Sequence, residues 1–238
     1  MLGVFDSGVG GRNALFRLRS LLPLSDIVFF ADTAHAPYGG RSREELIPLI
    51  RRDTEILRAA GAGKILAACC TAGCILETIP GVFPGVFPIV TPVARRAVTL
   101  TRRRTVGVLG TAATVKSGAF PRALRSLCPD VRTHAVAAPA LVTLAENGIT
   151  DPHDAGVRAE MTRLCRAFRG FPMDTLVLGC THFSSLGEAL ARAFPGVCQV
   201  SSADVGAECF ADSLTEQERD GEGRTLFLNE KGDIVNHS

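Results

Sequence analysis

The segment TLVLGCTHFSS, residues 175–185, places reactive side chains directly after an apolar run. It is an apolar run that stops at Gly179 and is followed at once by Cys180, Thr181 and His182. This pattern is typical of a buried parallel strand that ends in a tight turn, with a thiol and an imidazole at its carboxyl end. Open α/β sheets bind ligands at that end of their strands. We therefore expect Cys180 and His182 to lie in a ligand site.

A second apolar run, ILAACCT at residues 65–71, also brings a thiol, Cys69, to a strand end. A free thiol has a pKa of about 8.5, and a nearby imidazolium or helix amino terminus makes its thiolate more accessible. A pKa near the working pH is what a general acid–base group needs. With Cys69 and Cys180 on opposite faces of one carbon, one thiolate removes a proton while the other thiol delivers one. The product is the mirror image of the substrate.

Each thiol needs a neighbouring group that accepts and returns its proton. Asp6, at the end of the first predicted strand, and Glu146, in the second half of the chain, are candidates to assist Cys69 and Cys180. His182 is a third candidate, and a helix-capping or core role is the simpler alternative for it. The other cysteines are expected to be small, buried, apolar side chains: Cys70, Cys74, Cys128, Cys165, Cys198 and Cys209.

Two loops carry further signals. After a first strand at residues 2–5, the glycines of DSGVGG (6–11) allow a ligand close to the backbone, and a helix starting near Arg12 would point free N–H groups at an anion. The pattern is not GxGxxG, so a dinucleotide is not indicated. Helix caps are the plain alternative for Asp6 and Ser7.

The second loop, residues 32–42, follows a predicted strand at 27–31. It contains a proline, paired glycines and Tyr38, the only tyrosine of the chain. These features favour a cradle for a carboxylate over a plain turn, which remains the alternative.

The second half of the sequence weakly repeats the pattern of the first half. Residues 105–111 (TVGVLGT) echo residues 1–7 (MLGVFDS), and the Cys180 strand echoes the Cys69 strand, which implies two related α/β halves. Closely spaced prolines between residues 80 and 92 allow only short strands and indicate a crossing between the halves. We expect one domain from residues 1–92 and 201–238, and another from 93–200. Other patterns predict helices over 43–60, 117–127, 139–148, 152–168 and 204–214, strands over 131–136 and 197–200, and a hairpin over 226–235.

Composition narrows the possible partners. The chain has 238 residues, 46% hydrophobic and 21% charged, with a net charge of +2 that favours no particular partner. The basic run at 102–104 fits a solvated helix end better than a phosphate-binding patch. One Tyr and no Trp argue against nucleic-acid binding.

The same composition bears on the compartment and on metals. No signal precedes the first strand and no apolar run reaches the about 18 residues of a spanning helix, so we expect a cytosolic protein without a membrane partner. The eight cysteines then fit free thiols better than disulfides. Their spacing is not that of a zinc ribbon, and we expect no structural metal.

Five motifs occur in series: VFDSGVGG at 4–11, ADTAHAPYGGRS at 31–42, ACCTAG at 68–73, GTAATVKSG at 110–118 and LGCTHF at 178–183. Their order and spacing, from the first strand to about Glu208, resemble those of glutamate racemases in the cofactor-independent aspartate/glutamate racemase superfamily. The resemblance implies two pseudo-symmetric α/β domains, each a mostly parallel sheet flanked by helices, with the active site in the cleft between them. It also implies interconversion of L- and D-glutamate without a cofactor, supplying D-glutamate for peptidoglycan, by a homodimer.

The resemblance assigns roles residue by residue. The cysteine at the position of Cys69 deprotonates the D-enantiomer in that family, and the one at Cys180 the L-enantiomer. Asp6, Glu146 and His182 match the assisting groups. The positions that match substrate-binding residues are Asp6, Ser7, Tyr38, Gly39, Cys70, Thr71, Thr114, Thr181 and His182.

Three positions depart from the family pattern. Cys70 stands where the family has Asn, which is both donor and acceptor, whereas a thiol is a weak version of each. Loss of one such contact costs about 1–3 kcal/mol, which bears on affinity and substrate identity. His35 replaces a usual Arg, and Ala138 stands where a Cys is common.

Several alternatives stay open. Because Cys70 departs from the family pattern, two alternatives remain. The chain could be a related racemase that acts on aspartate or another carboxylate, or a degenerate racemase with little turnover. A hydrolase with Cys180 as nucleophile and His182 as base needs an oxyanion hole but no second thiol. A binding protein without turnover is a third class. Pyridoxal phosphate catalysis is not favoured, because none of the three lysines is placed at a strand end in the proposed cleft.

Overall fold

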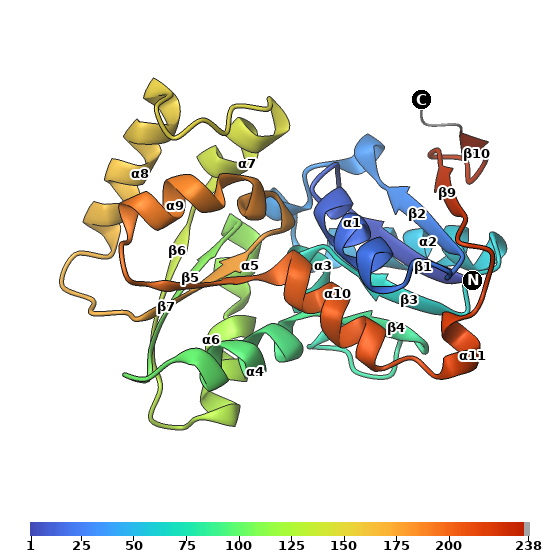
Figure 1. Ribbon diagram of the computed structural model, residues 1–238, viewed down its shortest axis with the longest axis horizontal. Coiled ribbons are helices and arrows are strands. Elements are labelled where there is room, and N and C mark those ends of the chain that lie inside the picture. Colours follow the sequence, from blue (N-terminus) through green and yellow to red (C-terminus); the bar gives the residue numbers. More distant parts are fainter. Residues whose placement is uncertain (236–238) are drawn as a thin grey trace.

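Two mostly parallel sheets, one in each half of the chain, form the framework of the computed structural model, which describes residues 1–235 (Figure 1). In the first sheet the strand order is β10-β9-β2-β1-β3-β4, and only β10 runs antiparallel to its neighbour. In the second sheet the order is β6-β5-β7-β8, all parallel. The two-sheet α/β fold confirms the fold class predicted from the sequence.

The strands have the apolar character that a sheet covered by helices requires. Every residue of β1, β5 and β7 is buried. The strands of the first sheet are β1 (Leu2–Asp6), β2 (Ile27–Ala31), β3 (Lys64–Ala67), β4 (Val86–Pro88), β9 (Thr225–Leu228) and β10 (Ile234–Val235). Those of the second are β5 (Thr105–Gly110), β6 (Arg132–Ala137), β7 (Thr175–Gly179) and β8 (Cys198–Ser201).

Most connections between strands contain helices, several of which begin at side chains that cap their free N–H groups, as Ser42 does for α2. The helices are α1 (Gly11–Leu21), α2 (Arg43–Ala59), α3 (Cys70–Leu76), α4 (Val90–Leu100), α5 (Ala112–Ser117), α6 (Ala119–Leu127), α7 (Pro139–Glu146), α8 (Ala155–Ala167), α9 (Gly187–Ala193), α10 (Ser202–Asp212) and α11 (Glu216–Arg219). Three 3₁₀ segments are η1 (Thr33–His35), η2 (Tyr38–Gly40) and η3 (Thr181–Leu186).

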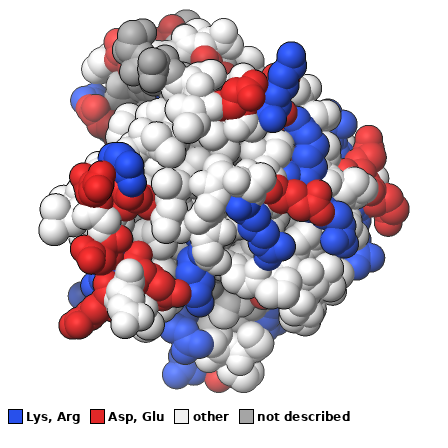
Figure 2. Space-filling view, turned by 90° about the vertical axis from the view of Figure 1, so that its right-hand side faces the viewer, with Lys and Arg blue, Asp and Glu red and all other residues white. Residues whose placement is uncertain are grey.

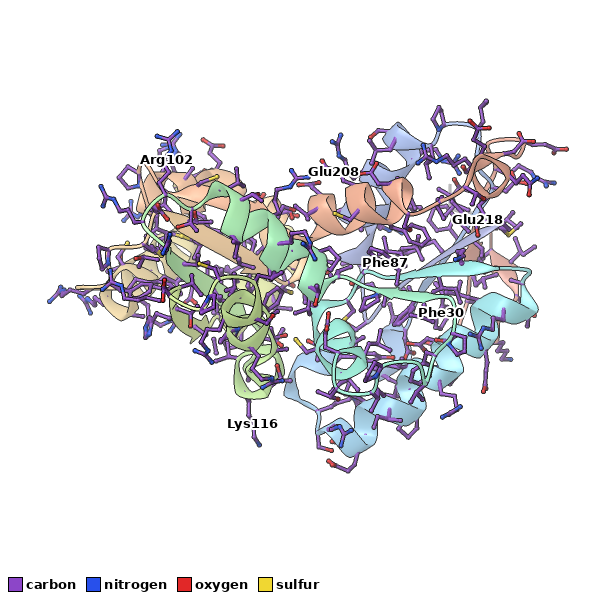
Figure 3. The ribbon with its side chains drawn as sticks, turned by 90° about the horizontal axis from the view of Figure 1, so that it is seen from below. Phe30, Phe87, Arg102, Lys116, Glu208 and Glu218 are labelled. Atoms are coloured by element: carbon purple, nitrogen blue, oxygen red, sulfur yellow. The ribbon has the colours of Figure 1, made fainter. Side chains whose placement is uncertain are left out.

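Helix α10 joins the two halves, as the sequence predicted for a helix over 204–214. It follows β8 of the second sheet and packs on α1 and α4. Its Glu208 accepts hydrogen bonds from Arg17 of α1 at 2.6 Å and from Arg96 of α4 at 3.0 Å, and its Phe210 meets Phe87 of β4 edge-on at 5.7 Å (Figure 3). The division into residues 1–92 with 201–238 and 93–200 stays a prediction, and residues 236–238 lie outside the described residues.

Some boundaries differ from the sequence prediction. The helix expected over 117–127 is α6, which begins at Ala119; the sequence did not predict the short helix α5 before it, which ends where Gly118 takes a left-handed conformation (φ +63°). The strand through Cys69 stops at Ala67, and α3 begins at Cys70. The proline-rich stretch holds only one strand, β4, and then α4, which accommodates Pro92 in its first turn where no N–H partner is needed.

The surface is mixed in charge. Figure 2 shows Lys and Arg side chains interspersed with Asp and Glu on the face that carries the C-terminal hairpin. Residues 102–104 lie in the exposed loop after α4, as expected for a solvated helix end. Within residues 1–235 there is no helix with the length and apolar character needed to cross a bilayer.

Candidate active site

A small buried pocket lies where the carboxyl ends of strands from both sheets meet. Its volume is about 20 Å³, which is room for about one water molecule. The first half contributes the turn after β1, segment η2 and the start of α3, and the second half contributes the ends of β5 and β7 and the helix α7. The lining residues are Ser7, Pro37, Tyr38, Gly39, Cys69, Cys70, Thr71, Thr111, Val142, Glu146, Cys180, Thr181 and His182.

The pocket contains nearly all of the residues that the sequence singled out. Two of them, Asp6 and Thr114, lie behind the lining and hydrogen-bond to residues within it. Sequence reasoning missed Pro37, Thr111 and Val142. The internal repeat already aligned Thr111 with Ser7, so it carried a signal for one of them.

Cys180 faces the imidazole of His182. Its Sγ is 3.6 Å from Nδ1, and Nε2 on the other side of the ring is 3.5 Å from Oε1 of Glu146. The sulfur and the ring are buried, whereas Glu146 is partly exposed. The three groups therefore form a path along which a proton of the thiol can pass to the imidazole, with a carboxylate placed to stabilise the resulting cation.

Cys69 has different partners. Its Sγ donates to Oγ of Ser7 at 3.4 Å, and Cys69 itself precedes the first residue of α3. Fully buried Asp6 accepts from the backbone of Gly8 at 3.0 Å and from the hydroxyl of Thr181 at 3.0 Å. Because α1 begins without a side-chain cap, the alternative that Asp6 and Ser7 cap this helix is wrong. Asp6 instead connects the turn after β1 to the Cys180 strand end.

Both thiols are held in their protonated form by the dry pocket. Burial raises the pKa of Cys69 to about 12, and the charge of Asp6 adds to the effect. Burial also raises the pKa of Cys180, with a backbone hydrogen bond at His182 opposing it. Burial raises the pKa of Asp6 itself to about 6, although His182 and Thr181 act against this. A thiolate in this pocket therefore needs an additional positive charge close to it.

Hydroxyl groups join the two halves beside the thiols. Thr71 of α3 lies 3.1 Å from the hydroxyl of Thr111 and 3.4 Å from that of Thr114, and the last two are 3.0 Å apart. Gly39 packs directly on Thr111, and an added Cβ at Gly39 would lie 2.6 Å from Cβ of Thr111. These contacts close the pocket over the thiols.

The remaining cysteines do not all fit their predicted role. Cys74 is buried as expected, and Cys70 is buried but lines the pocket. The prediction of buried side chains is wrong for Cys165 and Cys198, which are exposed on α8 and at the start of β8. Cys128 and Cys209 are half-buried.

The side chains near the pocket do not form a typical cofactor or metal site among the described residues. All three lysines of the chain are exposed and none lines the pocket; Lys116 points outward from α5 (Figure 3). Among the described residues, no three or more His, Cys, Asp and Glu side chains are arranged to hold a metal ion.

The fold and the site together define a class. One buried thiol from each of two similar α/β halves, facing a common pocket, is the arrangement expected of an isomerase that inverts a carbon centre. The family model for Asp/Glu/hydantoin racemases matches residues 24–210, and the chain belongs to this family. The resemblance found in the sequence motifs is thereby confirmed.

Individual relatives agree with the family assignment. The chain is 36% identical over 221 residues to a glutamate racemase of Syntrophus aciditrophicus, covering 91% of this chain and 80% of that protein. It is 38% identical over 192 residues to that of Corynebacterium kroppenstedtii, where the match covers 78% of this chain and only 64% of the relative. The glutamate racemase of Francisella tularensis, solved in complex with D-glutamate, superposes with a TM-score of 0.85 at 26% identity, covering 95% of this chain and 86% of the other.

Proposed function

We propose that this chain interconverts L- and D-glutamate without a cofactor, with Cys69 and Cys180 as the two acid–base groups. The observation that carries the proposal is the placement of one thiol from each half in a single buried pocket. The relatives named above are glutamate racemases, and one is solved with D-glutamate, which supports glutamate as the substrate.

The reaction balances within the pocket. One thiolate takes the α-proton of the substrate, leaving a carbanion next to its carboxylate, and the opposite thiol gives its proton to the other face. The proton count of the protein is unchanged, but the proton now resides on the other sulfur. We assign removal from the L-enantiomer to Cys180 and from the D-enantiomer to Cys69, following the family resemblance. His182 with Glu146, and Asp6 with Ser7, then return each thiol to its starting state.

The substrate supplies the charge that the thiols need. An amino acid brings an α-ammonium group, and an opposite charge within a few ångströms favours the charged form of a buried thiol. This counteracts the burial that raises the pKa values of Cys69 and Cys180. An α-ammonium group placed near the reacting thiol, with the two carboxylates held away from it, therefore favours formation of the thiolate.

Substrate entry requires the pocket to open. A volume of about 20 Å³ is far less than an amino acid occupies. We propose that the halves separate at the contact of Gly39 with Thr111 and at the threonine hydroxyls, and close again on the substrate. Ser7, Tyr38, Gly39, Cys70 and Thr71 then contact it from the first half, and Thr114 and Thr181 from the second. We further propose a cytoplasmic homodimer that supplies D-glutamate for peptidoglycan synthesis.

The deciding experiment follows α-hydrogen exchange. The purified protein is incubated with L-glutamate in D₂O without cofactor, and exchange is measured by NMR and optical rotation by circular dichroism. Exchange with racemisation supports the proposal. Exchange with aspartate or another acid alone would assign the chain to a sibling racemase, and no exchange with any amino acid would refute racemisation.

Closure at Gly39 can be tested by adding one methyl group. A Cβ in Gly39→Ala would clash with Thr111, which holds the halves apart, and overpacking of this kind costs about 1–3 kcal/mol. We expect KM for glutamate to rise about tenfold or more, with the melting temperature almost unchanged. Gly40→Ala is the matched control, because a Cβ there meets nothing within 4 Å. Equal KM values for the two variants would contradict closure at this contact.

Cys70, which stands where the family has Asn, allows a second test of the proposed function. Cys70 is buried in the pocket next to Cys69. If its thiol replaces two substrate hydrogen bonds by weaker ones, Cys70→Asn should raise kcat/KM for glutamate about tenfold. The change is measured for glutamate and aspartate in parallel. A fall for glutamate would mean that the pocket is built around the thiol, and a selective gain for another acid would change the substrate assignment.

A further inference from the structure

The hydroxyl of Tyr38 is held by two buried carboxyl groups that the reaction does not use. Its Oη is 2.6 Å from Oδ2 of Asp32, at the end of β2, and 2.6 Å from Oδ2 of Asp53, on α2. All three side chains are fully buried. Tyr38 and the adjoining Gly39 line the pocket, so this group connects α2 to the active site.

Counting hydrogens shows that one carboxyl group is protonated. A phenol has one hydrogen and can donate to only one of its two neighbours. The other short oxygen–oxygen contact therefore needs a hydrogen from the carboxyl group. Two ionised carboxylates would leave this second contact repulsive at a fully buried position.

The partners of the two carboxyl groups identify which one holds the proton. Asp32 accepts from Nδ1 of His35 at 2.8 Å and from Nη1 of Arg52 at 3.1 Å. Oδ1 of Asp53 has no hydrogen-bond partner among the described residues, and Arg52 is 3.9 Å away from it. Asp32 is therefore the ionised member. Asp53 donates to Tyr38, and Tyr38 donates to Asp32.

The position of Arg52 keeps this arrangement fixed. Its Nη2 donates to the backbone oxygen of Glu230 at 2.7 Å, and its guanidinium lies over the ring of Phe30 at 5.9 Å. Because Arg52 is already engaged with Asp32, it cannot also neutralise Asp53 without giving up these contacts.

We propose that Asp53, in its neutral form, is a positioning residue that fixes Tyr38 and thereby the Tyr38–Gly39 wall of the pocket. Loss of its proton would release the phenol from one side and loosen that wall. The link from Asp53 to Tyr38 stands on the geometry alone. The consequence for catalysis rests on the proposed function.

The surrounding charges oppose ionisation. Asp53 is faced by Tyr38 from η2, by Asp32 directly after β2 and by Asp6 from β1, and among the described residues the positive charge beside it is that of Arg52 on its own helix. Burial raises the pKa of Asp53 to about 7, from an ordinary value of 3.8, and Asp32 and Asp6 add to the effect.

The sign of the pH effect follows from this raised value. The neutral acid is favoured in the folded state, so its contribution to stability is fully present below pH 4 and is lost as the pH rises through about 7. Asp53→Asn keeps a neutral donor of the same shape and removes this titration. The stability of the wild type should therefore fall relative to that variant between pH 4 and 8.

The chain offers a specific probe, because Tyr38 is its only tyrosine and it has no tryptophan. With tyrosine labelled with ¹³C at Cζ, one resonance reports on this hydroxyl. We expect it to titrate with a midpoint near pH 7 in the wild type and to stay constant in Asp53→Asn. In His35→Asn, the control for the imidazole that hydrogen-bonds to Asp32, the midpoint should persist. A midpoint that survives Asp53→Asn, or no titration in the wild type, would overturn the proposal.

Measurements of KM and kcat distinguish a role of Asp53 in positioning Tyr38 from a role in folding stability alone. If only the neutral form binds, KM for glutamate rises about fivefold from pH 7 to 8 in the wild type and stays flat in Asp53→Asn. Asp53→Ala should raise KM at all pH values, with a smaller change in kcat. Equal kinetics of the Asn and Ala variants would refute positioning. An inactive wild type would refute the proposed reaction, while the tyrosine resonance would still decide the role of Asp53.

Discussion

Replacing either Cys69 or Cys180 by serine should lower kcat/KM for glutamate racemisation about a thousandfold or more. A serine hydroxyl has the shape of a thiol but is far too weak an acid to supply a base at neutral pH. Enantiomers have equal free energies in water, so kcat/KM must fall by the same factor in both directions. A loss in one direction only would be thermodynamically impossible and would indicate an assay artefact.

Exchange of the α-hydrogen with solvent deuterium distinguishes the roles of the two sulfurs, which the values of kcat/KM cannot do. Cys69→Ser retains Cys180 and should slowly exchange the α-hydrogen of L-glutamate without inverting it, whereas Cys180→Ser should do so only with D-glutamate. Exchange is followed by NMR in D₂O, with Cys165→Ser as the control, because that thiol is exposed on α8. Full racemisation by Cys69→Ser would contradict the two-thiol mechanism.

Replacing His182 by asparagine should cost about a hundredfold in kcat/KM. The imidazole lies between Cys180 and Glu146, at 3.6 Å and 3.5 Å, and no other side chain in the described residues links these two groups. Without it, the proton of Cys180 has no acceptor. The loss should be accompanied by a larger primary deuterium isotope effect for L-glutamate, because proton removal by Cys180 becomes slower relative to the other steps.

The isotope effect measured with D-glutamate is the comparison for the His182→Asn variant. In the proposed mechanism Cys69, which hydrogen-bonds to Ser7, removes the proton of D-glutamate, so the isotope effect for this enantiomer should change less. His153→Asn is the matched control, because His153 is exposed and distant from the pocket lining. Equal isotope effects for both enantiomers in the His182 variant would contradict its assignment to Cys180.

The sequence by itself determined the strand ends and the residues placed on them. An apolar run that stops at a glycine or a thiol is a local pattern, and in a parallel sheet the carboxyl ends of neighbouring strands necessarily share one edge. For this reason Cys69, Cys180 and His182 could be assigned to a ligand site before any distance was known, whereas Ser7 and Thr181 were assigned to it by the family resemblance. The two-half α/β fold followed from the internal repeat in the same way.

Only the tertiary structure decided how close the two halves come. The addition of β9 beside β2 and the contact of Gly39 with Thr111 depend on packing between segments far apart in the chain. Asp53 is the clearest case, because its helix pattern predicts nothing beyond a polar residue. Its role arises from full burial next to Tyr38 and Asp32, and burial and hydrogen counting can be judged only when all the neighbours are in place.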